Sequence, residues 1–200
     1  DSNVWLNVGT GEGDVGKPFG GTGGGTVSGF TAGGYTGSAY SNVIDKYSLT
    51  SNANAVDHGD LTGIRLYAAG SSSTTHGFTG GGINAAGMPG YINVIDKYAF
   101  ASNTTASSHG VLSSVKGYCA GQSSSTHGFT TGGNGPGTPR SIEKYAFSSN
   151  TTSTNHGDIT LQLTYVAGQS SNTDGFTTGG YNSGPYDTTM NKFSFASAGN

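Results

Sequence analysis

The sequence has little of what helical and nucleic-acid-binding proteins need. Only 10% of its 200 residues are charged, Glu12 and Glu143 are the only glutamates, and 37 residues are glycine. Because glycine costs about 1 kcal/mol at each interior helix position, this composition excludes a helix bundle or a coiled coil. The formal net charge is −3 and no basic stripe is present, which argues against a nucleic-acid partner.

Long hydrophobic runs and pairs of cysteines are also missing. No stretch approaches 18 apolar residues, so we predict no membrane span. Cys119 is the single cysteine, which excludes an internal disulfide framework. The chain starts at Asp1 without methionine and without a recognisable signal peptide, so we expect it to be processed or to be a piece of something longer.

What the sequence does hold is a repeat of four strings in a fixed order. Gly-Phe-Thr-x-Gly-Gly lies at 29–34, 77–82, 128–133 and 175–180, and a string ending in Lys-Tyr or Lys-Phe lies at 43–47, 94–98, 141–145 and 189–193. His-Gly lies at 58–59, 109–110 and 156–157, and Tyr-x-Ala-Gly lies at 67–70, 118–121 and 165–168. Successive phenylalanines of the first string are 48, 51 and 47 residues apart.

Each string has the composition of a short β-strand, because it is rich in aromatic, β-branched and threonine residues and is bounded by Gly, Ser and Asn. Four strands in about 50 residues are typical of a kelch-type propeller blade. We therefore predict an all-β, kelch-like β-propeller of about four four-stranded blades. The expected blades are 13–58, 59–109, 110–156 and 157–200, after a junction at 1–12. The alternatives are an incomplete propeller that another chain completes, and a stack of β-sheet repeats.

Recurrent aromatic residues mark the expected packing between neighbouring blades. The aromatic residue of the second string and the residue two positions later share one strand face. The structural repeat positions are Phe30, Phe78, Phe129 and Phe176 in the first string, and Tyr47, Tyr98, Tyr145 and Phe193 in the second. We attribute the Gly-Gly pairs to crowding of the inner strands. We expect residues 13–15 to supply the strand that the last blade lacks, which would close the ring.

Residues that could carry chemistry recur at fixed repeat positions, which favours a scaffold role for them. Equivalent histidines would lie one per blade, so we assign them to hydrogen bonds that close turns rather than to a metal site. Neighbours such as Asp45 and Lys46 point to opposite strand faces, and we expect them to bond across strands or blades. Cys119 stands where other copies have Ala68 and Val166, so we expect a buried small hydrophobe. We predict no catalytic residue, no metal, no cofactor and no enzyme activity.

The connector between Gly-Gly and the second string is what differs among the copies. It varies in length and composition, and loops on a rigid scaffold are common binding sites. The candidate ligand-binding residues in these connectors are Tyr40, Tyr91, Arg140 and Tyr186. Exposed tyrosine beside asparagine and aspartate suits sugar recognition. The alternative is that the connectors are unconstrained or contact neighbouring subunits.

The Gly-Gly pair followed by a strand with two aromatic residues resembles kelch repeats, although Leu49, Phe100, Phe147 and Phe195 stand where kelch blades usually carry Trp. The phrases at 94–98 and 120–133 (Val-Ile-Asp-Lys-Tyr and Ala-Gly-Gln-Ser-Ser-Ser-Thr-His-Gly-Phe-Thr-Thr-Gly-Gly) resemble repeats in virion and tail-fibre-like proteins of tailed phages, including phages of marine bacteria and cyanobacteria. This resemblance implies an extracellular virion component on a tail or fibre appendage, present in many copies. Its expected partners are other virion proteins and a host-surface glycan or receptor. The alternatives are a decoration protein without a receptor and a secreted glycan-binding or glycan-active propeller.

Overall fold

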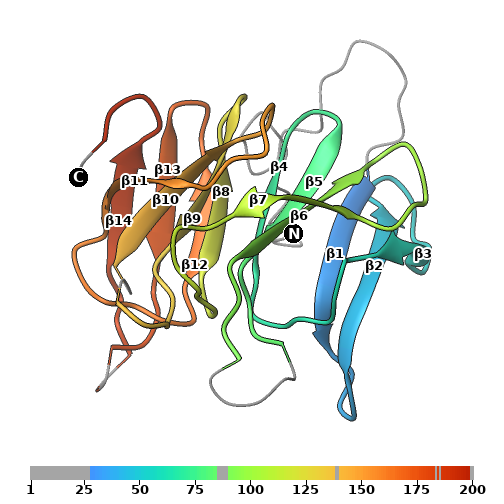
Figure 1. The fold of residues 1–200 in the computed structure, drawn as a ribbon, viewed down its shortest axis with the longest axis horizontal. Helices are drawn as coiled ribbons and strands as arrows, with labels where there is room; N and C mark the ends of the chain where they lie inside the picture. The colour runs from blue at the N-terminus through green and yellow to red at the C-terminus, as the bar shows by residue number, and fades with distance from the viewer. Residues whose placement is uncertain (1–27, 85–89, 138–139, 183, 185, 199–200) are drawn as a thin grey trace.

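The computed structural model describes residues 28–84, 90–137, 140–182, 184 and 186–198, and the regular elements of this part are all β-strands (Figure 1). They form four antiparallel sheets of three or four strands, so the prediction of an all-β chain is confirmed. The first sheet holds β1 (Ser28–Tyr35), β2 (Tyr40–Ser48) and β3 (Val56–Asp60). The second holds β4 (Ala69–Ser72), β5 (His76–Gly80), β6 (Val94–Ala99) and β7 (Ser107–Val111). The third holds β8 (Ala120–Ser123), β9 (His127–Thr131), β10 (Ser141–Ala146) and β11 (Thr154–Asp158), and the fourth holds β12 (Ala167–Ser170), β13 (Asp174–Thr178) and β14 (Met190–Ser194).

Each repeated string forms one strand, and the order of strands within a complete sheet follows the order of the strings. In the second and third sheets the Tyr-x-Ala-Gly strand pairs with the Gly-Phe-Thr strand, which pairs with the Lys-Tyr strand, which pairs with the His-Gly strand. The sheets therefore divide the chain after the His-Gly strand, whereas the expected modules divide it at that string. Within the described residues the first sheet has no Tyr-x-Ala-Gly strand and the fourth has no His-Gly strand.

The four sheets lie side by side in chain order, from β1–β3 at one end of the long axis to β12–β14 at the other (Figure 1). The strands β4, β8 and β12 are neighbours at the inner side of this arrangement. No strand pairing among the described residues joins the first sheet to the fourth, so the described part of the chain is not a closed ring. Residues 13–15, to which the closing strand was assigned, lie outside the described residues.

Glycine allows close approach of backbone both in the inner strands and at the Gly-Gly pairs. A Cβ on Gly121 in β8 would overlap the carbonyl oxygen of Gly70 in β4. The Gly-Gly pairs are crowded as well, since a Cβ on Gly81 would lie 2.6 Å from the Lys116 carbonyl oxygen and a Cβ on Gly82 would lie 2.9 Å from the Leu66 carbonyl oxygen. Both glycines also have left-handed backbone, with φ of 66° and 106°. The pair therefore serves both the close approach of neighbouring backbone and the turn at the end of the strand.

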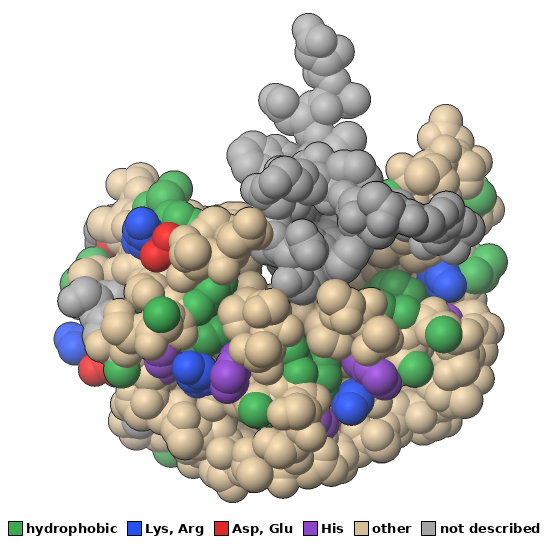
Figure 2. Space-filling view, turned by 90° about the horizontal axis from the view of Figure 1, so that it is seen from above, with side chains coloured by type: hydrophobic (Ala, Val, Ile, Leu, Met, Phe, Trp, Pro, Cys, Tyr) green, Lys and Arg blue, Asp and Glu red, His purple; other side chains and the backbone are tan. Residues whose placement is uncertain are grey.

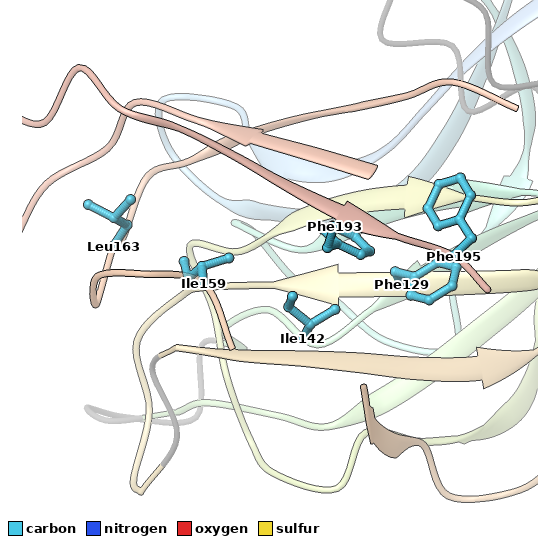
Figure 3. Close-up of a cluster of buried hydrophobic side chains, with 6 residues drawn as sticks. All are labelled: Phe129, Ile142, Ile159, Leu163, Phe193 and Phe195. Atoms are coloured by element: carbon cyan, nitrogen blue, oxygen red, sulfur yellow. The ribbon is translucent and has the colours of Figure 1, made fainter. Parts of the chain in front are cut away.

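Three clusters of buried hydrophobic side chains lie between neighbouring sheets, and we call each such interface a seam. The first seam holds Ile44, Leu61, Tyr98 and Ala106, with Phe30, Ala32 and Phe100 packed against them. The second holds Phe78, Ile95, Leu112, Tyr145 and Phe147. The third holds Phe129, Ile142, Ile159, Leu163, Phe193 and Phe195 (Figure 3). The hydrophobic core is thus divided into three similar layers, each formed by two consecutive sheets.

The aromatic rings at the three seams adopt the same geometry. Phe30 stacks on Phe100, Phe78 on Phe147 and Phe129 on Phe195, with ring centroids 4.6, 4.6 and 4.7 Å apart and interplanar angles of 18°, 21° and 22°. A lysine of the paired strand lies over each first-string ring at 5.7–5.9 Å. This repetition shows that the recurrent aromatic residues build the interfaces between sheets. Phe176, the fourth copy, is only half-buried.

Candidate functional site

Two buried ion pairs cross the seams and involve the acidic residues of two acid-Lys strings, Asp96 and Glu143. Asp96 in β6 accepts a hydrogen bond from Arg65 Nη2 at 2.7 Å, and the side chains are 0% and 2% exposed. Asp96 also accepts hydrogen bonds from the backbone N–H and the hydroxyl of Thr62. Lys116 and Glu143 form the equivalent pair at 2.9 Å. The carboxylates of Asp96 and Glu143 therefore bond to residues on the other side of a seam, which agrees with the expected bonds across blades.

The ion pair with Lys116 favours the ionised form of the Glu143 carboxyl group despite its burial. Burial alone would raise the pKa of Glu143, but Lys116 and the hydrogen bonds from Ser153 and the Ser113 N–H lower the pKa below its ordinary value. Burial lowers the pKa of Arg65, and the charge of Asp96 opposes that shift. An ionised carboxylate that is paired and hydrogen-bonded in this way serves stability rather than proton transfer.

The histidines of the His-Gly strings do not close turns, which corrects that expectation. His58, His109 and His156 donate from Nε2 to the carbonyl oxygens of Ala99, Ala146 and Ser194 at 2.8, 2.9 and 2.8 Å. Each bond links one sheet to the next. In the described part of the chain, no group of three or more His, Cys, Asp and Glu side chains is placed to share a metal ion.

The second set of histidines does sit in local turns. His76 and His127 are hydrogen-bonded through Nδ1 to Thr75 and Thr126, the residues before them. Burial, then the nearby Lys97 and Lys144, lower the pKa of His76 and of His127 respectively. Purple histidine side chains and blue side chains of lysine or arginine lie near one another on the face seen in Figure 2.

Cys119 is buried, as expected from the apolar residues at its repeat position. Burial raises the pKa of its thiol to about 11. A thiol with this pKa is almost fully protonated at neutral pH, so it is a weak nucleophile.

The connector residues predicted to bind ligand do not form one site. Tyr40 contacts Tyr35 of the same sheet with ring centroids 5.5 Å apart, and Arg140 forms an exposed ion pair with Asp158 at 3.5 Å. Tyr186 is 83% exposed and contacts Tyr181 with ring centroids 5.9 Å apart. Each of these three residues therefore has a partner within its own repeat.

Tyr91 is different, because it lies close enough to Tyr118, which the connectors do not contain, to raise the pKa of that phenol. Tyr67, Tyr118 and Tyr165 precede the inner strands β4, β8 and β12, and we call them the tyrosine cluster. The ring centroids of Tyr67 and Tyr118 are 4.3 Å apart and those of Tyr118 and Tyr165 are 4.4 Å apart. Tyr67 is 47% and Tyr165 is 60% exposed, so the cluster presents aromatic surface to solvent.

All three tyrosines of the cluster have left-handed backbone, with φ of 57°, 60° and 57°. Such a conformation costs a bulky L-residue roughly 1–2 kcal/mol. It accompanies a ladder of backbone hydrogen bonds between successive copies, from the Tyr118 N–H to the Tyr67 carbonyl at 2.9 Å and from the Tyr165 N–H to the Tyr118 carbonyl at 3.0 Å. The scaffold thereby holds three aromatic rings in fixed positions at one end of the inner strands.

The tyrosine cluster also has its own hydrogen bonding. Burial, a hydrogen bond with Tyr165 and the neighbouring phenols of Tyr165, Tyr67 and Tyr91 raise the pKa of Tyr118 to about 12. Tyr118 is therefore a neutral phenol at physiological pH. Sequence reasoning missed this site, since it assigned the Tyr-x-Ala-Gly strings to strands only; the signal was a large aromatic residue at one repeat position in three copies.

No protein-family model matches the chain, and no curated protein is significantly similar to it in sequence. The described part of the chain contains no helix that is long and apolar enough to cross a membrane.

Proposed function

We propose that this chain is a non-enzymatic, kelch-like repeat scaffold that binds a glycan through the tyrosine cluster, as a component of a tail or fibre appendage of a tailed phage. The observation that carries the binding proposal is the exposure of Tyr67 and Tyr165 on rigid, left-handed backbone. Tyrosine rings that are not needed in the core, yet are held at a backbone cost, indicate a functional surface.

The chemistry of the tyrosine cluster suits a sugar. A phenol ring offers a flat apolar face for the C–H groups of a pyranose, and its hydroxyl can donate and accept hydrogen bonds. Tyr91 lies close enough to Tyr118 to affect its pKa, so Tyr91 borders the same surface. Tyr40, Arg140 and Tyr186 remain predicted contacts at the other connectors.

The burial of the acidic side chains and of the thiol supports the non-enzymatic part of this proposal. Asp96 and Glu143 are buried in ion pairs, and Cys119 is a buried, protonated thiol. A glycoside hydrolase would instead need two carboxylates that face a substrate about 5–10 Å apart.

The geometry of the repeats supports the propeller part of the proposal, and the resemblance of their sequences supports the virion part. Three seams of equal geometry and adjacent inner strands support a kelch-like arrangement of sheets around an axis. The resemblance of the phrases at 94–98 and 120–133 to phage virion repeats supports the location, with other virion proteins as partners. Many copies on one particle would convert weak sugar contacts into firm attachment.

Saturation-transfer NMR with a panel of bacterial-surface oligosaccharides tests the proposal. We expect at least one oligosaccharide to receive saturation from the protein, and Tyr67→Ala and Tyr165→Ala to abolish the transfer without lowering the melting temperature. Tyr35→Ala, which removes an exposed tyrosine outside the cluster, is the matched control. Binding that is unchanged in both cluster variants would show that the tyrosine cluster is not the site.

A second candidate function is a decoration or structural protein without a receptor. It is favoured by the incompletely covered end sheets, where Met190 is 67% exposed and Phe176 is half-buried. Failure of every oligosaccharide to bind, together with incorporation of the chain into particles, would favour this role.

A further inference from the structure

Each seam joins two different sheet faces. The first carries the phenylalanine of the Gly-Phe-Thr strand with the aliphatic residue of the paired strand, as Phe78 and Ile95 do, and we call it the Phe face. The second carries the aromatic residue of the Lys-Tyr strand and the residue two positions later, as Tyr145 and Phe147 do, and we call it the Tyr face. The seams always pair the Phe face of one sheet with the Tyr face of the next.

The fourth sheet has a Phe face that no described sheet covers. Phe176 takes the position of Phe78 and is half-buried. Met190 takes the position of an isoleucine in each of the other sheets and is 67% exposed. Those isoleucines, Ile44, Ile95 and Ile142, are fully buried. The apolar character of this face is thus retained without the partner that buries it elsewhere.

The first sheet begins the described chain with the complementary Tyr face. Asp45, Tyr47 and Leu49 alternate along one side of the β2 segment, and all three are half-buried. The Tyr47 ring lies over Gly29 in the same way as the Tyr98 ring lies over Gly77. In both places a Cβ on the glycine would overlap the tyrosine ring. The exposed Tyr face therefore already has the side-chain conformation that it adopts inside a seam.

We propose that the Tyr face of one copy docks on the Phe face of a second copy, forming a fourth seam between chains. Within one chain the two faces lie on sheets at opposite ends of the long axis (Figure 1). Leu49 of one copy would pack on Phe176 of the next, in the place of the stacked phenylalanine pairs. Such a contact is heterologous, so it continues from copy to copy until it closes a ring or forms a filament.

Continuity with the three internal seams favours a second copy over an unrelated partner, because this chain carries both halves of the interface. The new seam lacks the histidine of a His-Gly strand and the aliphatic residue directly after that strand (Leu61, Leu112 or Ile159), which each internal seam contains. It is consequently weaker than an internal seam, and the assembly depends on protein concentration. The proposal does not depend on glycan binding.

Crosslinking of introduced thiols tests the assembly. In the variant Leu49→Cys/Phe176→Cys, a short bis-maleimide is expected to give a ladder of covalent multimers on a denaturing gel. Mixing the two single variants should give heterodimers only, and peptide mass spectrometry should locate the link between positions 49 and 176. The native Cys119 is buried and stays unmodified in the folded protein. The pair Leu49→Cys/Tyr186→Cys, with the second thiol away from the Phe face, is the matched control and should give no ladder.

The same experiment can overturn the proposal in two ways. A fast-migrating monomer with an internal link would mean that the two faces meet within one chain. No link at all would mean that another occupant, such as residues 1–27 or a different protein, covers the faces. As an independent measurement, sedimentation of the unmodified chain should show a mass that rises with concentration, and Phe176→Asp should reduce the multimer fraction about tenfold with an unchanged melting temperature. A mass that stays monomeric at all concentrations would contradict the proposal.

Discussion

At the scale of single residues, the positions that cross the seams change together from copy to copy. Arg65 faces Asp96, and Lys116 faces Glu143. In the third seam the cation becomes Leu163 and the acid becomes Asn191, whose amide oxygen still accepts a hydrogen bond from the Thr160 N–H at 2.9 Å. In all three seams this side chain therefore has to accept a hydrogen bond from the backbone that follows the His-Gly strand. A negative charge on it is required only where the facing residue is a cation.

This pairing predicts a double-mutant cycle. Asp96→Asn keeps the acceptor for Thr62 but leaves Arg65 buried without a counter-charge, which should cost about 3–5 kcal/mol of unfolding free energy. Arg65→Leu combined with Asp96→Asn reproduces the third seam and should recover most of that loss. Denaturant unfolding of the wild type, both single variants and the double variant measures the coupling. A double variant as unstable as Asp96→Asn alone would refute the argument.

The lowered pKa of Glu143 predicts a pH dependence of stability. Its folded-state pKa lies below its ordinary value of 4.5, so the folded protein binds fewer protons than the unfolded chain near that pH. The stabilisation is fully present above about pH 4.5 and is lost as the pH falls through the folded-state pKa. Glu143→Gln should therefore be less stable than the wild type at pH 7, and the difference should shrink below pH 4.5. A difference that is constant with pH would contradict this account.

At the scale of strands, the close approach of β4, β8 and β12 depends on glycine. A Cβ on Gly121 would overlap the Gly70 carbonyl oxygen, while a Cβ on Gly70 itself would meet nothing within 4 Å. Gly121→Ala should therefore lower the unfolding free energy by about 1–3 kcal/mol, because the inner strands must move apart. Gly70→Ala, at the same repeat position, should be neutral or slightly stabilising. Equal effects of the two substitutions in thermal unfolding would argue against the observed spacing of the inner strands.

The strands are also the part of the fold that could be predicted from the sequence. Period, β-propensity and bounding glycines identify each strand, because these signals are local. The grouping of strands into sheets is not local, and the His-Gly strand of β3 pairs with the strand before it rather than with the one after it. The histidine bonds across seams and the tyrosine cluster depend on which strands become neighbours. The left-handed φ of Tyr67 could not be predicted from the sequence, because tyrosine rarely adopts this conformation.

At the scale of the whole molecule, each hydrophobic cluster of the described residues joins two sheets that are consecutive in the chain. Stability of such an array is approximately a sum of sheet terms and seam terms. The binding surface and the assembly surfaces are then separate: the tyrosine cluster lies at the ends of the inner strands, whereas Tyr47 and Phe176 lie on the outer faces of the two end sheets. This separation would allow copies to assemble while their tyrosine clusters stay accessible.

The central claim is that one Phe-face-on-Tyr-face seam recurs three times. Nuclear Overhauser contacts between assigned aromatic rings test it most directly. We predict ring-to-ring contacts for Phe30 with Phe100, Phe78 with Phe147 and Phe129 with Phe195, and no such contact for Phe176 in dilute monomer. Rings of Phe78 and Phe129 that contact only side chains of their own sheets would contradict the account.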